Sequence, residues 1–129
     1  VRPALEAGTD VIIDRYLDSS VAYQGAGRDL DATEIRNLSL FAVQGLLPNL
    51  TVLLDLEASA ALARRSKTGQ EPDRLEREKA EFFEAVRQGY LALAAAEPER
   101  FFIVDARQSV EEMAALIRAR VDELIAGNA

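Results

Sequence analysis

Polar side chains gather directly after the apolar run at residues 11–13. They bring together a carboxylate, a guanidinium, two hydroxyls, a phenol and an amide: Asp14, Arg15, Ser19, Ser20, Tyr23 and Gln24. An arginine fork suits the bidentate binding of a phosphate. Residues 20, 23 and 24 share one face if the segment is helical, and the glutamine amide could then hydrogen-bond the edge of a base. The alternative is a polar loop that caps its own backbone, and the residues alone leave both interpretations open.

Composition excludes several other kinds of chemistry. The 129 residues include no cysteine and no histidine, which rules out thiol nucleophiles, disulfides, Cys/His zinc sites and histidine acid–base catalysis. Phosphoryl transfer remains open because it depends mainly on positioning and charge neutralisation. With 22 acidic and 15 basic residues, the chain is a poor candidate for binding nucleic acid or an anionic membrane. Without a signal-peptide pattern or a long apolar run, we expect a cytoplasmic protein.

Three short apolar runs, each ending in aspartate, are typical of strands buried on both faces of a parallel sheet. They are Val11–Asp14, Val52–Asp55 and Phe101–Asp105. Helical spacing between them predicts an α/β fold. Aspartates at the carboxyl ends of such strands can face a ligand or Mg²⁺, or can cap the following turn. We favour the ligand role for the first aspartate and the capping role for the other two.

Capping patterns predict where the helices begin. We expect helices from Asp31 to Pro48, from about 57 to 65, from about Asp73, and after Ser109. Phe82, Phe83 and Tyr90 are predicted to be core residues of the third helix. The polar segment at 66–72 is either a plain connector or a mobile lid. The basic residues around it either neutralise a phosphoryl group or form a solvated surface with the neighbouring acids.

The sequence contains no loop that could hold the phosphates of a nucleoside triphosphate. No G-x-x-x-x-G-K-[ST] pattern occurs, and Gly25-Ala26-Gly27 follows a polar segment and lacks the third glycine of a dinucleotide fingerprint. From the residues alone, a nucleotide-binding site is therefore indicated only after the first apolar run.

The motif Asp14-Arg15-Tyr16 followed by Asp18-Ser19-Ser20-x-Ala22-Tyr23-Gln24-Gly25 resembles the nucleoside-monophosphate site of bacterial thymidylate kinases. The resemblance covers essentially all 129 residues. Its looser parts are the strand at 48–56, the lid helix at 61–65, the far edge of the lid at 73–76, the helix around 82–90, and the last strand and helix at 104–112.

The resemblance implies a role for each matching residue in the reaction of ATP and dTMP to give ADP and dTDP. It places Asp14 and Ser19 in the dTMP site, Arg15 on the 5′-phosphate, Ser20 and Gln24 on the thymine edge, and Tyr23 near the deoxyribose. It makes Arg74, with Arg64 or Lys67, the lid cations, and puts Arg107 beside the ATP adenine. Arg15 and Arg74 would be the catalytic residues. Mg²⁺ would arrive bound to ATP, without a dedicated protein ligand in this sequence.

The resemblance also implies an incomplete fold. The family has a three-layer, P-loop NTPase-like parallel sheet with strand order 2-3-1-4-5 and flanking helices. The three runs here match its third, fourth and fifth strands, so the first two strands and the phosphate loop are absent. We expect one partial domain over 1–129, with a lid at about 65–74, that alone is inactive and marginally stable. The complete parent is expected to be a homodimer, with the helix at 35–46 as a candidate contact, although its apolar stripe could equally be part of the core. Alternatives are another nucleoside-monophosphate kinase or a non-catalytic nucleotide-binding module.

Overall fold

The computed structural model describes residues 1–27, 32–57 and 74–127. In chain order, its elements are α1 (Arg2–Glu6), α2 (Leu17–Gly27), α3 (Ala32–Ala42), β1 (Thr51–Asp55), α5 (Arg74–Ala96), β2 (Phe101–Asp105) and α6 (Val110–Gly127). No helix within these ranges combines the length and the apolar character that a membrane span requires.

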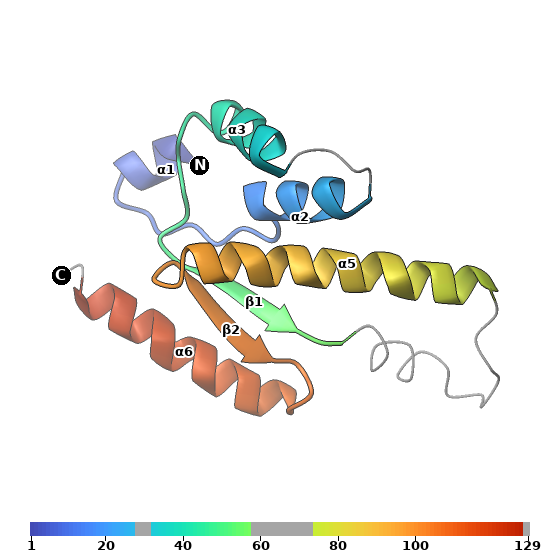
Figure 1. Cartoon of the computed structure of the whole chain (residues 1–129). Coiled ribbons are helices and arrows are strands. Elements are labelled where there is room, and N and C mark those ends of the chain that lie inside the picture. The colour runs from blue at the N-terminus through green and yellow to red at the C-terminus, as the bar shows by residue number, and fades with distance from the viewer. Residues whose placement is uncertain (28–31, 58–73, 128–129) are drawn as a thin grey trace.

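The sheet in the described residues consists of β1 and β2, which pair in parallel. Their register runs from Thr51 opposite Phe101 to Asp55 opposite Asp105, so both carboxyl ends lie at the same edge. Parallel neighbours need a crossover, which α5 provides. Figure 1 shows α5 on one side of the two strands and α6 on the other. The second and third apolar runs are therefore confirmed as parallel strands of an α/β arrangement. Their predicted burial on both faces is wrong for the described residues, since Leu54 and Ile103 are 54% and 47% exposed.

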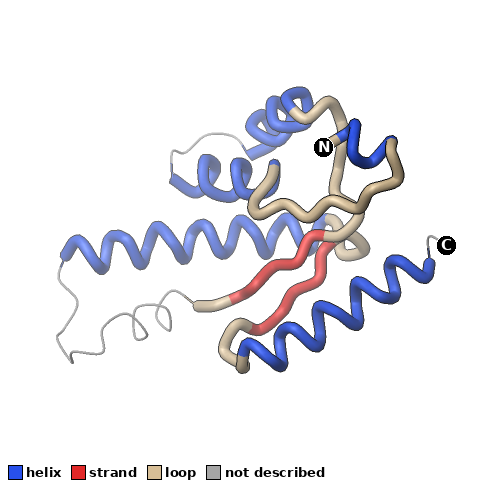
Figure 2. The backbone as a smooth tube through the Cα atoms, turned by 180° about the vertical axis from the view of Figure 1, so that it is seen from behind, coloured by secondary structure: helices blue, strands red, loops and turns tan. Residues whose placement is uncertain are grey.

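Beyond α5, two more helices stack away from the sheet. Helix α2 packs against α5, and α3 packs against α2, as both views show (Figures 1 and 2). Buried apolar side chains come from all these layers: Leu17, Val21, Ala22, Ile35, Val86, Ala94, Phe101 and Val104. This stack fixes α2, which contains most of the polar motif, against the helix that crosses the sheet.

The first apolar run, Val11–Asp14, was predicted as a buried strand, and this is wrong. The segment has no regular secondary structure, and Ile12 is 100% exposed. A strand is stabilised by backbone hydrogen bonds to a neighbour, and no described residue provides such a neighbour for this segment. Apolar composition alone therefore leaves it as an exposed loop leading into α2.

Two further expectations need correction. The helix predicted up to Pro48 ends at Ala42, because Gln44 and Gly45 have φ of 55° and 72° and the Gly45 N–H donates to the Leu40 carbonyl at 2.9 Å. The predicted core placement of Phe82 and Phe83 is wrong, since both side chains are exposed on α5.

Two predicted helix starts agree with the structure, and one predicted helix lies outside the described residues. Helix α5 begins at Arg74, next to the predicted start. The start of α6 is confirmed by the Ser109 hydroxyl, which accepts a hydrogen bond from the Glu112 N–H at 3.1 Å. The helix predicted at about 57–65 falls almost wholly at 58–73, outside the described residues.

Helices α2 and α5 lie close together at Gly89. A β-carbon added there would lie 3.3 Å from Cα and 3.5 Å from the carbonyl oxygen of Ala22, which are backbone atoms of a packed helix. We expect Gly89→Val in the complete protein to lower the free energy of unfolding by about 1–3 kcal/mol, because it forces the two helices apart. Urea unfolding measures this loss. Gly127→Val, at a position with nothing within 4 Å, is the control, and equal stability losses in the two variants would contradict the packing argument.

Candidate functional site

Arg15 has an unusual backbone at the entrance to α2. Its φ is 65°, in the left-handed region that costs a non-glycine residue roughly 1–2 kcal/mol. The guanidinium carbon lies 5.2 Å from the centre of the ring of Tyr23, in the second turn of the helix. The strained backbone therefore holds an exposed cation beside an aromatic ring, a geometry that suits an anion attached to a planar or sugar group.

Tyr23 is held by other aromatic rings. Its ring centre lies 6.2 Å from that of Phe82 and 6.3 Å from that of Tyr90, both on α5. The Tyr90 hydroxyl also shares a 2.6 Å hydrogen bond with the Ser19 hydroxyl. Burial raises the pKa of Tyr90 above its ordinary value. These contacts fix the first two turns of α2 against α5.

The predicted binding residues are thus only partly brought together. Arg15, Tyr23 and, through Tyr90, Ser19 form one cluster. Asp14 and Ser20 flank it and are exposed. Gln24 lies in α2, as the predicted helical face requires, but its side chain is outside the described part.

Of the predicted lid and ATP residues, the structure describes Arg74 and Arg107. Arg64 and Lys67 are outside the described residues. Arg74 begins α5, is largely exposed, and donates to Glu78 at 3.3 Å. Arg107 follows β2 and pairs with Asp105.

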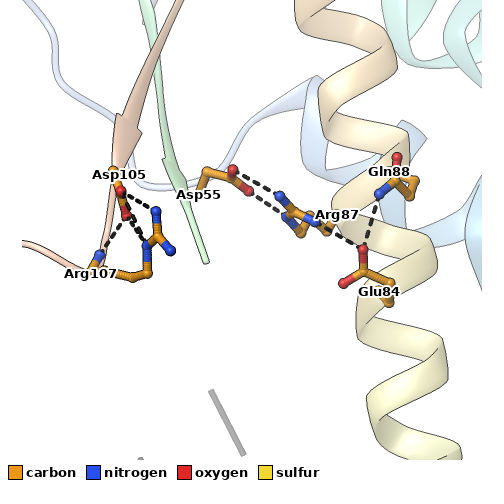
Figure 3. A network of polar contacts seen from close by, with 6 residues as sticks. All are labelled: Asp55, Glu84, Arg87, Gln88, Asp105 and Arg107. Carbon is orange, nitrogen blue, oxygen red and sulfur yellow. Dashed lines mark hydrogen bonds and ion pairs between the residues drawn. The ribbon is translucent and has the colours of Figure 1, made fainter. Parts of the chain in front are cut away.

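Two aspartate–arginine pairs occupy the carboxyl edge of the sheet (Figure 3). Asp55 accepts two hydrogen bonds from Arg87, at 2.7 and 3.2 Å, and Arg87 also donates to Glu84 at 3.0 Å. Asp105 accepts from both the backbone N–H and the side chain of Arg107, which fits the predicted turn-capping role. In this structure both carboxylates are held by arginines.

The Asp105 pair predicts a measurable titration. Hydrogen bonds from the Arg107 side chain, then its backbone N–H, lower the Asp105 pKa from 3.8 to about 2. Because the pKa of Asp105 is lower in the folded state than in the unfolded state, the ionised carboxylate stabilises the fold at pH values above the unfolded pKa. This contribution is lost as the pH falls toward 2. Carbon-detected NMR of the Asp105 carboxyl should show a midpoint near 2 in the wild type. Arg107→Met should return it toward 4, and an ordinary midpoint in the wild type would mean that the pair does not form in solution.

A partly buried ion-pair network was missed from the sequence. Arg100 donates to both oxygens of Asp18, at 2.7 and 3.0 Å, and also to Glu97. Arg36 donates to Glu97 at 3.0 Å. The hydrogen bond from Arg100 lowers the pKa of Glu97 and outweighs the opposing effect of burial. Asp18 and Arg100 are 82 residues apart, so no local pattern links them.

The sequence model of the family described as "Thymidylate kinase" matches residues 1–117. The chain belongs to the thymidylate kinase family. Three relatives named thymidylate kinase show the extent of the similarity. The protein of Clavibacter michiganensis subsp. michiganensis is 63% identical over 129 residues, covering 100% of this chain and 61% of the relative.

The other two relatives show a similar extent of identity and coverage. The Leifsonia xyli subsp. xyli protein is 62% identical over 122 residues, covering 95% of this chain and 58% of the relative. The Deinococcus radiodurans protein is 50% identical over 123 residues, covering 95% and 59%. The chain therefore spans about three fifths of the length of the thymidylate kinases that it matches.

The described residues can be examined for a site that would bind Mg²⁺. Within residues 1–27, 32–57 and 74–127, no group of three acidic residues is placed to hold an ion. Asp55 and Asp105, the carboxylates at the sheet edge, are engaged by Arg87 and Arg107. The described residues therefore do not form a metal cage by themselves.

Proposed function

We propose that the complete protein carrying these residues transfers a phosphoryl group from MgATP to dTMP, giving ADP and dTDP for dTTP synthesis. The observation that carries this proposal is Arg15, held in a left-handed backbone beside Tyr23 at the start of α2. Membership of the thymidylate kinase family supports it.

The proposed fold is the three-layer, P-loop NTPase-like sheet of this family. The two parallel strands with α5 and α6 on either side are consistent with its α/β layers. In this proposal, residues 1–129 are part of one nucleoside-monophosphate kinase domain, with the lid at about 65–74. The phosphate loop is not among the 129 residues, so the triphosphate would be held by another part of the complete protein.

In the proposed dTMP site, the Arg15 fork binds the 5′-phosphate and orients it for attack on ATP. Tyr23, supported by Phe82 and Tyr90, would lie against the deoxyribose. Ser20 and Gln24 would bind the thymine edge, with Asp14 and Ser19 at the margin of the site.

Closure over ATP is the second part of the proposal. Arg74, with Arg64 or Lys67, would neutralise charge on the transferring group. Arg107 would exchange its pairing with Asp105 for contact with the adenine. Mg²⁺ is proposed as part of the MgATP substrate and supplies charge neutralisation on the phosphates.

We further propose a cytoplasmic homodimer that binds neither nucleic acid nor a membrane. Its candidate contact is α3, where Leu38 and Phe41 are 71% and 84% exposed. Two large apolar side chains one turn apart on one helix are typical of a surface that another protein covers.

The test is a substrate panel with protein expressed from its complete coding sequence. ADP release is measured with dTMP, dUMP, dCMP and dGMP. We expect kcat/KM for dTMP to exceed that for dUMP by roughly tenfold or more, because one methyl group is worth about 1–3 kcal/mol in a fitted pocket. A preference for another base would indicate a different monophosphate kinase. Binding of dTMP without ADP release would indicate a non-catalytic module.

A further inference from the structure

The most buried ion pair among the described residues lies away from the sheet edge that carries Asp55 and Asp105. Arg100 and Asp18 have side chains that are only 10% and 8% exposed, whereas the Arg107–Asp105 pair is 68% and 49% exposed. Arg100 stands directly before β2, at the opposite end of the strand from Asp105. The pair therefore lies in the interior, at the amino ends of the strands.

Arg100 links several elements to this one point. Its Nη1 donates to Asp18 Oδ2 at 2.7 Å and to Thr51 Oγ1 at 3.0 Å, and its Nη2 donates to Asp18 Oδ1 at 3.0 Å. Nη2 also donates to Glu97, directly after α5. Its guanidinium carbon lies 4.7 Å from the centre of the Phe101 ring. Thus the start of β1, the start of β2 and the end of α5 all fix the group that holds Asp18.

Asp18 belongs to the first turn of α2, three residues after Arg15. The next residue, Ser19, bonds to Tyr90 on α5. Because neighbouring residues of a helix point about 100° apart, these two contacts fix both the position and the rotation of the helix. The rotation of α2 determines the position of Tyr23 within the helix and the position of Arg15 just before it.

Stability alone does not account for such a pair. Desolvating two charges costs several kcal/mol, so replacing a buried ion pair with apolar residues is often neutral or stabilising. Here Arg100 Nε is also buried without a hydrogen-bond partner, which adds to the cost. What the bidentate fork provides is a fixed geometry, because two parallel bonds allow one orientation of the carboxylate.

We propose that Asp18 and Arg100 are positioning residues for the nucleoside monophosphate: they set the rotation of α2 and thereby place Arg15 and Tyr23 against it. This inference rests on the proposed function. Neither residue is proposed to touch the substrate, because both side chains are almost fully buried and bonded to each other. Their effect is expected on dTMP binding and not on ATP binding.

The test compares two arginine-to-lysine variants of the complete protein. Arg100→Lys keeps a cation but loses the fork, since lysine presents a single point charge. Arg87→Lys is the matched control, because Arg87 also forms a bidentate, part-buried pair with an aspartate, but this pair joins α5 to β1 and not to α2. We expect Arg100→Lys to raise the KM for dTMP about tenfold and to change the KM for ATP less than about twofold. Arg87→Lys should leave both constants within about twofold.

Thermal unfolding of both variants shows whether they are folded. If Arg100→Lys does not fold, Asp18→Asn replaces it, since the amide keeps the size of the side chain and removes its charge. An unchanged KM for dTMP in a folded variant overturns the positioning role, whatever the change in Tm. A wild type that does not phosphorylate dTMP refutes the proposed function and this inference with it. A wild type that does, with equal effects in the two lysine variants, refutes this inference alone.

Discussion

The 129 residues expressed alone are expected to form dTDP at a rate at least about 10⁴-fold below that of the complete protein. Phosphoryl transfer depends on positioning the triphosphate and neutralising its charge. The sequence has no G-x-x-x-x-G-K-[ST] loop to provide the backbone N–H groups and the lysine for that task. The measurement is ADP and dTDP formation by the purified chain, beside the complete protein at equal concentration.

A trace of kinase from the expression host is the main alternative source of product. The same chain with Arg15→Gly, purified in parallel, measures that contamination, because the host enzyme is unaffected by the substitution. Product above this background would contradict the prediction. An NMR titration with dTMP, with dCMP as control, asks separately whether the chain alone folds and binds. Dispersed signals that shift at Arg15 and Ser20 would show that binding survives where catalysis does not.

Folding of the isolated chain is expected to be marginal for a related reason. The apolar side chains of residues 11–13 are all exposed, and Ile12 completely so. Exposed apolar segments with unpaired backbone are prone to associate with other chains. Light scattering during heating should therefore show aggregation without a reversible, cooperative transition.

Local signals explain which elements could be predicted from the sequence. The start of α6 depends on Ser109 and Glu112, which are three residues apart and bond directly. Both pairing strands are continuous apolar runs, and the helix between them follows from periodicity. Arg15 and Tyr23 were recognised as site candidates because they lie within one short motif, and the structure brings their side chains together.

Features that depend on distant parts of the chain could not be predicted. The run Val11–Asp14 has the composition of a strand, but a strand also requires a neighbour, which composition does not reveal. The Asp18–Arg100 pair spans 82 residues, and the sequence holds many other arginines and acids that could pair. The left-handed backbone of Arg15 was not foreseen either, because arginine has no preference for it.

Replacing Arg15 by glycine is expected to lower the activity while leaving the stability unchanged or higher. Glycine adopts φ near 65° without a steric penalty, so Arg15→Gly relieves the strain while it removes the phosphate-binding fork. In the complete protein we expect the free energy of unfolding to stay the same or rise by up to about 1 kcal/mol. We expect kcat/KM for dTMP to fall roughly 10²–10³-fold, since charge-assisted hydrogen bonds to the phosphate are lost. Urea unfolding and steady-state kinetics measure the two quantities.

The chain offers a matched control for the backbone effect. Gln44 also has a left-handed backbone, with φ of 55°, but lies in the turn after α3 and outside the candidate site. Gln44→Gly should relieve similar strain and leave the kinetics unchanged. If Arg15→Gly lowers stability by more than about 1 kcal/mol, Arg15 is a structural residue whose contact with Tyr23 outweighs the strain. If it leaves kcat/KM intact, the fork does not bind the phosphate. If Arg15 binds the phosphate, replacing it should lower the activity without lowering the stability. The strain of its backbone is then kept for the sake of binding.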